Sequence, residues 1–314
     1  MIVNGTRLPL SPWFWRNLAL GLAVVGVGMG ALAVYAHLNV DPLADAQAYY
    51  LAATRLNEGQ PLYPPWLDPS GPTAYFYPPL LAVVLRPFAA TLSFEAFRIA
   101  WEAVILASFA LLVIRLGLTR RTALAVAILG MPIAFTLSVA QAHAPLTLLL
   151  AIGSPWSIAL ATNVKIFPAL VAVYWLGRRD WAALRRFAAW LVVLAAVQLV
   201  LEPTGSLDYL GALRPAWLGE VRNMSPYALS PILWAVLAVA GLVAALRLAP
   251  TRWGWASAVA LSTLVPPRLL SYMFMGLLAT LGGPKATAET PTRPVEPARP
   301  DEPPEPEPEV IGTA

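Results

Sequence analysis

The chain has 314 residues, of which 58% are hydrophobic and 12% are charged. Soluble domains carry about 25% charged residues, so this composition excludes an ordinary soluble domain and predicts a protein with lipid as its solvent. Cysteine is absent and only two histidines occur, His37 and His143, so we expect no disulfide, metal site or cofactor. Residues 1–284 carry 18 basic and 10 acidic side chains. Membrane topology explains this excess better than nucleic-acid binding does.

Apolar runs that approach the length of a membrane span recur along the chain. A transmembrane helix needs about 20 apolar residues. We expect spans at 17–36, 96–114, 122–140, 187–202, 227–246 and about 253–281, the last interrupted by Pro266, Pro267 and Arg268. A shorter apolar run covers 78–92. The predicted fold class is therefore an all-α, polytopic membrane domain over residues 1–283.

A polar segment, residues 37–77, separates the first span from the next apolar run. Asp41 is placed to cap a helix over 42–58, which Gly59 would end. Its apolar face is formed by Tyr49, Ala53 and Leu56. We therefore expect an amphipathic helix on the membrane surface.

The apolar segment 143–177 is broken by Gly153, Pro155, Lys165 and Pro168. It is too long for one helix across a core of about 30 Å, so we predict half-helices with a polar junction at Lys165.

Lys165 and Arg268 are cations within apolar sequence. A charge at membrane depth costs several kcal/mol, so each is expected to have a partner or an anionic ligand. Glu102, inside the predicted span 96–114, is the alternative partner, which would make one of the cations purely structural.

Arginine clusters predict the orientation. They flank the predicted spans at Arg7 and Arg16, at 115–121, at 178–186 and at 247–252. Since basic loops stay in the cytoplasm, we expect a cytoplasmic N-terminus in the plasma membrane and place 37–77, 203–226 and Arg268 outside. The Pro/Glu-rich tail, 284–314, is predicted to be disordered and cytoplasmic.

Several outer polar residues admit two interpretations. Asp45 lies in the first turn of the predicted helix, where it would either complement the helix dipole or act as a general base. Tyr77 suits an interfacial aromatic belt as well as a substrate wall. A lone histidine such as His143 at the surface is usually solvated. These residues alone do not decide between the interpretations.

Short motifs in order along the chain resemble glycosyltransferase family 87, also labelled domain of unknown function 2029. The first outer segment matches in Asp45-Ala-Gln-Ala-Tyr49-Tyr50, in Gly59-Gln-Pro-Leu-Tyr63 and in Phe76-Tyr77-Pro78-Pro79-Leu80 with Pro87. The later matches are Gln141, Lys165-Ile-Phe-Pro168, Arg178-Arg179-Asp-Trp181 and Asn223-Met-Ser225.

The resemblance implies a GT-C helix bundle with its active site on the outer face. Such enzymes pass a sugar, usually mannose, from a polyprenyl phosphate to a hydroxyl of a glycolipid or cell-envelope glycan. It implies Asp45 as the catalytic residue, with Lys165 and Arg268 as candidates for the donor phosphate. The expected substrate-binding residues are Asp41, Tyr49, Tyr77, Gln141, His143 and Asn223. The alternatives are a transporter or lipid flippase and an inactive relative that serves as a scaffold.

Overall fold

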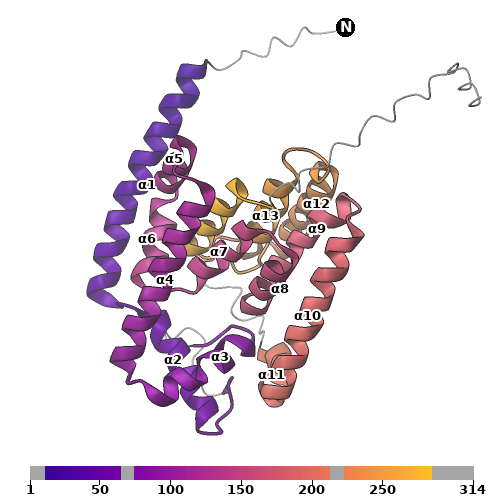
Figure 1. The fold of residues 1–314 in the computed structure, drawn as a ribbon. Helices are drawn as coiled ribbons and strands as arrows, with labels where there is room; N and C mark the ends of the chain where they lie inside the picture. The colour runs from indigo at the N-terminus through magenta and orange to yellow at the C-terminus, as the bar shows by residue number, and fades with distance from the viewer. Residues whose placement is uncertain (1–10, 65–73, 213–222, 285–314) are drawn as a thin grey trace, which may run out of the picture. The chain divides into compact units, whose positions relative to one another are not determined.

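The computed structural model describes residues 11–64, 74–212 and 223–284 (Figure 1). All regular structure in these ranges is helical, which confirms the all-α prediction. The predicted disordered tail lies outside the described residues from 285 onward, so its disorder stays a prediction.

Within these described ranges, four helices are long and apolar enough to cross a membrane. They are α1 (Pro12–Val40), α4 (Phe94–Leu116), α10 (Trp181–Leu201) and α12 (Pro231–Leu248). Only 6% to 22% of the residues in their apolar stretches are buried within the protein. Because so much apolar surface faces outward, these helices require a lipid environment, and the chain is a polytopic membrane protein.

The predicted span at 122–140 is bent in the structure. The structure has two helices there, α5 (Arg120–Ile128) and α6 (Gly130–Ser138), bent by 70° at Leu129. Pro132 explains the break, because it lacks an N–H and its ring clashes with the carbonyl four residues earlier.

α1 packs directly on this bend. A Cβ atom at Gly26 would lie 2.2 Å from the Ala127 carbonyl oxygen, and one at Gly30 would lie 2.9 Å from Gly130. Glycine therefore allows the two backbones to touch, and the C-terminal end of α1 is held beside the end of α6.

The two interrupted apolar segments are built from short helices. Residues 143–177 form α7 (His143–Ile152), α8 (Pro155–Val164), the 3₁₀ helix η1 (Phe167–Val171) and α9 (Ala172–Gly177). Residues 253–281 form α13 (Gly254–Leu264) and the 3₁₀ helix η4 (Ser271–Leu281). The predicted break at Lys165 is present, and the predicted interruption at Pro266 and Pro267 lies between α13 and η4 because proline cannot continue a helix.

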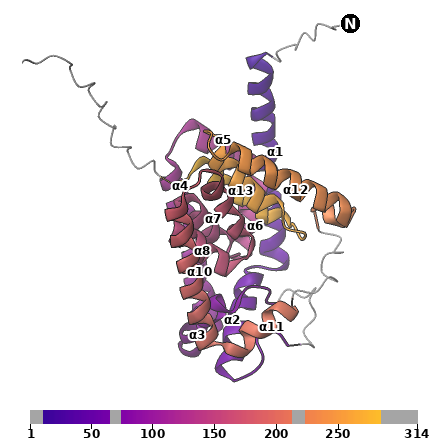
Figure 2. The same cartoon turned by 90° about the vertical axis from the view of Figure 1, so that its right-hand side faces the viewer.

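The polar segment 37–77 contains α2 (Ala44–Asn57) and is followed by α3 (Pro79–Thr91). α2 begins after Leu43, so the prediction that Asp41 caps it is wrong; Asp41 instead ends α1. Its predicted apolar face is 0% to 6% exposed and packs in the protein core, not on a membrane surface. α11 (Pro203–Ala212) joins α2 and α3 at one end of the bundle (Figures 1 and 2).

The arginine-rich loops lie at the opposite end (Figure 1). Arg115, at the end of α4, donates to the carbonyl oxygen of Gly283 at 3.3 Å. Gly177, at the end of α9, packs against Leu246 near the end of α12. The loops after α4, α9 and α12 therefore share one end of the bundle, as the arginine pattern requires. Which side of the membrane this end faces stays a prediction.

Candidate functional site

A cavity of about 350 Å³ opens where the broken helices meet the end of the polar segment 37–77. This volume falls within the range of about 300–1,000 Å³ typical of small-molecule sites. Its wall combines segment 76–77, one face of α7, the break at 165–168, α11, and the break between α13 and η4. The lining residues are Phe76, Tyr77, His143, Leu146, Leu150, Lys165, Ile166, Phe167, Pro168, Tyr209, Ser262, Thr263, Pro266, Pro267, Arg268, Tyr272 and Met273.

Lys165 reaches the cavity because α8 stops one residue earlier and the backbone becomes extended at Lys165 itself. Its Nζ lies 3.4 Å from His143 Nδ1 and 3.5 Å from the Tyr272 hydroxyl. It also lies over the ring of Tyr77, 5.3 Å from the centroid. His143 Nε2 contacts the carbonyl of Met273 at 3.1 Å, so Nε2 carries the proton and Nδ1 accepts from the lysine. Lys165 is thus oriented by neutral groups, and His143 is a buried wall residue, not a solvated one.

Arg268 follows two prolines at the second helix break. Its guanidinium lies over the ring of Phe76, 5.2 Å from the centroid. Asn223 braces the backbone on both sides of it: Nδ2 donates to the Pro267 carbonyl at 2.8 Å, and Oδ1 accepts from the Leu269 amide at 2.9 Å. Asn223 is not among the lining residues of the cavity, so its contact with substrate stays a prediction.

Glu102 does not pair with either cation. The ion pairs found in the described part of the chain join His37 to Asp41 and Arg98 to Glu95. The alternative that Glu102 neutralises Lys165 or Arg268 is therefore wrong. Among the described residues, the lining of the cavity includes two basic side chains and no acidic one.

Asp45 lies one step behind the cavity wall. Its Oδ2 accepts a hydrogen bond from Gln141 Nε2 at 2.6 Å. Gln141 Oε1 in turn accepts from the hydroxyl of Tyr49 at 2.8 Å and from that of Tyr77. Tyr77 lines the cavity, whereas Asp45 and Gln141 are not among the lining residues. The predicted base is therefore connected to the cavity through Gln141 and Tyr77.

The ionisation of Asp45 is strongly perturbed. Burial raises the pKa of its carboxyl from 3.8 to about 7, against the opposing effects of Lys165 and Arg268. Asp41 raises this pKa further. A carboxyl that titrates near neutral pH is matched to general-base work at that pH.

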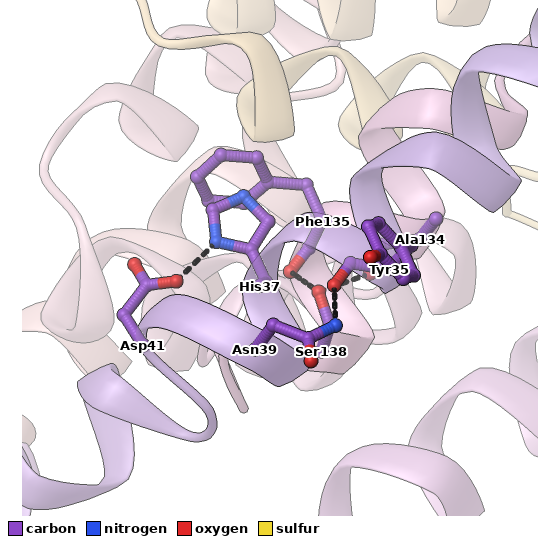
Figure 3. Close-up of polar contacts among 7 residues, drawn as sticks. All are labelled: Tyr35, His37, Asn39, Asp41, Ala134, Phe135 and Ser138. Atoms are coloured by element: carbon purple, nitrogen blue, oxygen red, sulfur yellow. Dashed lines mark hydrogen bonds and ion pairs between the residues drawn. The ribbon is translucent and has the colours of Figure 1, made fainter.

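Asp41 lies at the end of α1, beside α6 (Figure 3). Its Oδ1 is 2.7 Å from His37 Nδ1, and the His37 ring packs on Phe135 with the centroids 4.1 Å apart. Asp41 is not among the lining residues. Its effect on the Asp45 carboxyl is electrostatic, and its predicted contact with substrate is untested.

Comparison with known proteins decides the family. The family model of glycosyltransferase family 87 matches residues 75–265, more than half of the chain. The chain belongs to glycosyltransferase family 87. No curated protein and no solved structure matches it. It is accordingly a membrane protein of a glycosyltransferase family.

The family match covers part of the site. It includes the predicted site residues Tyr77, Gln141, His143, Lys165 and Asn223. The predicted residues outside the matched range are Asp41, Asp45, Tyr49 and Arg268. The structure brings members of both groups together, since Gln141 contacts Asp45 and Tyr77 contacts Tyr49.

The family 87 cavity also contains residues that sequence reasoning missed. Tyr272 is the main omission, because its hydroxyl and ring both contact Lys165. It lies in the apolar stretch 253–281, for which the sequence predicts a membrane span. Its hydroxyl is the only feature in the sequence that could have indicated a role in the site. Tyr209 in α11 also lines the cavity, and its distance in sequence from the other residues gave no indication of this.

The polar groups of the family 87 cavity suit an anionic, hydroxylated ligand. Lys165 and Arg268 are cations that bind phosphate well. Tyr77 and Tyr272 present rings and hydroxyls, which suit sugars. Across the described ranges, no group of three His, Asp or Glu side chains is placed to hold a metal ion.

Proposed function

We propose that this family 87 protein transfers mannose from a polyprenyl-phosphate donor to a hydroxyl of a glycolipid or cell-envelope glycan, on the outer face of the plasma membrane. One observation carries the proposal. Two cations, Lys165 and Arg268, face a cavity whose wall is hydrogen-bonded through Tyr77 and Gln141 to the Asp45 carboxyl. Sugar transfer from a phosphate requires cations that stabilise the leaving phosphate and, beside them, a base that accepts the proton of the acceptor hydroxyl.

The cations act on the leaving group. When the bond between the anomeric carbon and the phosphate oxygen breaks, negative charge grows on the phosphate. Lys165 and Arg268 stabilise that charge by hydrogen bonds in a water-poor site, where such bonds are strongest. The phosphate leaves as an anion and needs no proton.

Asp45 acts on the nucleophile. The acceptor hydroxyl oxygen bonds to the anomeric carbon, and its proton passes to the Asp45 carboxylate. A pKa of about 7 leaves a large fraction of this carboxyl ionised at neutral pH, while the ionised group is a stronger base than an ordinary aspartate.

The apolar part of the cavity suits the donor lipid. Leu146 and Leu150 of α7 face it together with Ile166 and Phe167 at the helix break. An isoprenoid chain would cover these side chains, while the phosphate reaches Lys165. This combination favours a lipid-linked donor over a soluble nucleotide sugar.

The test compares two aspartates. Purified protein in nanodiscs would be given radiolabelled polyprenyl-phosphate mannose and a bacterial glycolipid extract. Asp45→Asn should lower the rate of transfer by about 10²- to 10⁴-fold, the usual contribution of a general base. Asp41→Asn, the matched control, should lose less than about threefold, because Asp41 bonds to His37, whereas Asp45 is connected to the cavity wall through Gln141 and Tyr77.

Three outcomes would contradict the proposal. Wild-type turnover by Asp45→Asn would remove Asp45 from catalysis. Movement of the donor lipid across proteoliposomes without sugar transfer would support a flippase. Absence of transfer by the parent protein with every donor tested would support the scaffold alternative.

A further inference from the structure

The first turn of α2 is joined by its backbone to the last turn of α6. The Leu43 amide donates to the Ser138 carbonyl at 3.1 Å, and the Asp45 amide donates to the Val139 carbonyl at 3.1 Å. Amides at the start of a helix and carbonyls at the end of one lack intrahelical partners, and here the two helix ends satisfy each other. This junction sets Asp45 beside Gln141, which follows α6 by three residues.

Two tyrosine hydroxyls surround the Gln141 amide oxygen at this junction. The Tyr49 hydroxyl accepts from the Ala142 amide at 3.1 Å, and its own proton faces both Gln141 Oε1 at 2.8 Å and the Tyr77 hydroxyl at 2.9 Å. The Tyr77 hydroxyl donates to the same oxygen. Because a tyrosine hydroxyl donates to its oxygen, the Gln141 amide turns its NH₂ group toward Asp45 Oδ2, as observed.

Strained backbone surrounds the contact. Leu43, two residues before Asp45, and Ala140, one residue before Gln141, both have φ of 56°. Residues with a Cβ rarely adopt this conformation, and such strain persists only where the surroundings impose it. The Trp101 indole N–H contributes by donating to the Ala140 carbonyl at 2.9 Å. The protein thus accepts strain on both sides of the Asp45–Gln141 pair.

We propose that Gln141 is a positioning residue that orients the Asp45 carboxyl, holds its Oδ2 and leaves Oδ1 for the proton of the acceptor. This role deepens the proposed function and rests on it for its catalytic meaning. Among the described residues, Asp45 Oδ1 accepts no hydrogen bond. Gln141 itself is 2% exposed. Its proposed role therefore acts through Asp45 and does not require Gln141 to contact the substrate.

The inference predicts a shift in the ionisation of Asp45. Gln141 donates to the carboxylate, and losing a donor to the charged form raises the pKa of a carboxyl. A hydrogen bond to a charged group corresponds to about a 10- to 100-fold preference, or about one to two pH units. Asp41, Lys165 and Arg268 also act on this carboxyl, and they are unchanged by substitution of Gln141.

Four other polar side chains lie near the Asp45 carboxyl or its neighbours. The hydroxyls of Tyr49 and Tyr77 lie on the far side of the Gln141 amide, and their rings belong to the same buried network as Asp45. Tyr272 and His143 face Lys165. None of these four would replace the lost donor.

The main experiment removes the donor and keeps the volume. Gln141→Met is similar in length and cannot donate to Asp45. The pKa of Asp45 would be measured by infrared titration of its carboxyl stretch in ligand-free protein in nanodiscs, with Asp45→Asn to assign the band. Thr136→Val is the matched control, because it removes an equally buried hydrogen bond in α6, to the Pro132 carbonyl, that does not touch Asp45.

We expect Gln141→Met to raise the pKa of Asp45 by about one to two units and Thr136→Val to leave it unchanged. The pH at which transfer from polyprenyl-phosphate mannose is half-maximal should move upward by the same amount. If Gln141→Met does not fold, Tyr49→Phe replaces it. That variant loses one donor to the amide oxygen, and a smaller upward shift is expected.

An Asp45 pKa that does not move in either variant, or moves equally in Thr136→Val, would overturn the inference. The infrared measurement needs no substrate, so it also separates the two proposals. If the pKa shifts but the parent protein transfers no mannose, the coupling of Gln141 to Asp45 stands and the proposed function fails.

Discussion

Replacing Lys165 by methionine tests the cavity most directly. The ammonium lies among His143, Tyr272 and the ring of Tyr77, with no carboxylate paired to it. Methionine keeps most of the length and apolar volume of the side chain. Folding should therefore survive, because removal of a charge from apolar surroundings relieves a cost of burial.

The expected loss of affinity follows from the hydrogen bonds available to a phosphate. A hydrogen bond to a charged group is worth about 1.5–3 kcal/mol, and every 1.4 kcal/mol is about tenfold in affinity. Loss of one such bond predicts donor binding weaker by about 10- to 100-fold. Lys165 also lowers the pKa of Asp45, so the variant should need a higher pH to ionise its base.

Both effects can be measured in one protein preparation. Binding of radiolabelled polyprenyl-phosphate mannose in nanodiscs gives the dissociation constant. The rate of sugar transfer, measured from about pH 5.5 to 9, gives the pH at which the rate rises as Asp45 ionises. Arg186→Met serves as the control, since Arg186 is exposed and bonds only within its own helix. Donor affinity equal to that of the parent protein, with normal folding, would show that Lys165 does not hold the phosphate.

Two further predictions follow from the structure. Burial raises the pKa of Asp45 from 3.8 to about 7, so its contribution to stability is full below pH 3.8 and is lost as the pH rises through 7. Asp45→Asn should therefore raise the melting temperature more at pH 8 than at pH 5, and a difference of the opposite sign would contradict the assigned burial. In this cysteine-free chain, Gln60→Cys should react with an impermeant maleimide added to intact cells, whereas Leu118→Cys, at the arginine-rich end, should not. Equal labelling of both would refute the predicted orientation.

The sequence by itself determined the fold class and the family. The excess of apolar residues cannot be buried in a core without lipid, and the apolar helices α1, α4, α10 and α12 have 18 to 29 residues, within or above the range of about 17–25 that spans a bilayer. Proline and lysine also located the break after α8, because proline cannot continue a helix. These properties depend on composition and local spacing, which one sequence contains in full.

Local signals failed where a distant residue competes with them. Asp41 has the side chain and position of a helix cap, but α2 begins at Ala44, where its amides meet the carbonyls at the end of α6. The apolar face that includes Tyr49 predicted a membrane surface, but it packs in the protein core. Spacing reveals that such a face is apolar, and it does not reveal what covers it.

Only the tertiary structure decided how the site is assembled. Gln141 was expected to contact substrate, and the fold places its amide between the Asp45 carboxylate and two tyrosine hydroxyls. Lys165 was given a possible acidic partner, and the fold gives it Tyr272 instead, 107 positions away. Such pairings form where the ends of several helices lie close together in the fold. Hydrogen bonds between side chains depend on atomic positions to within a few tenths of an ångström. Residue types and their order along the chain do not contain that distance information.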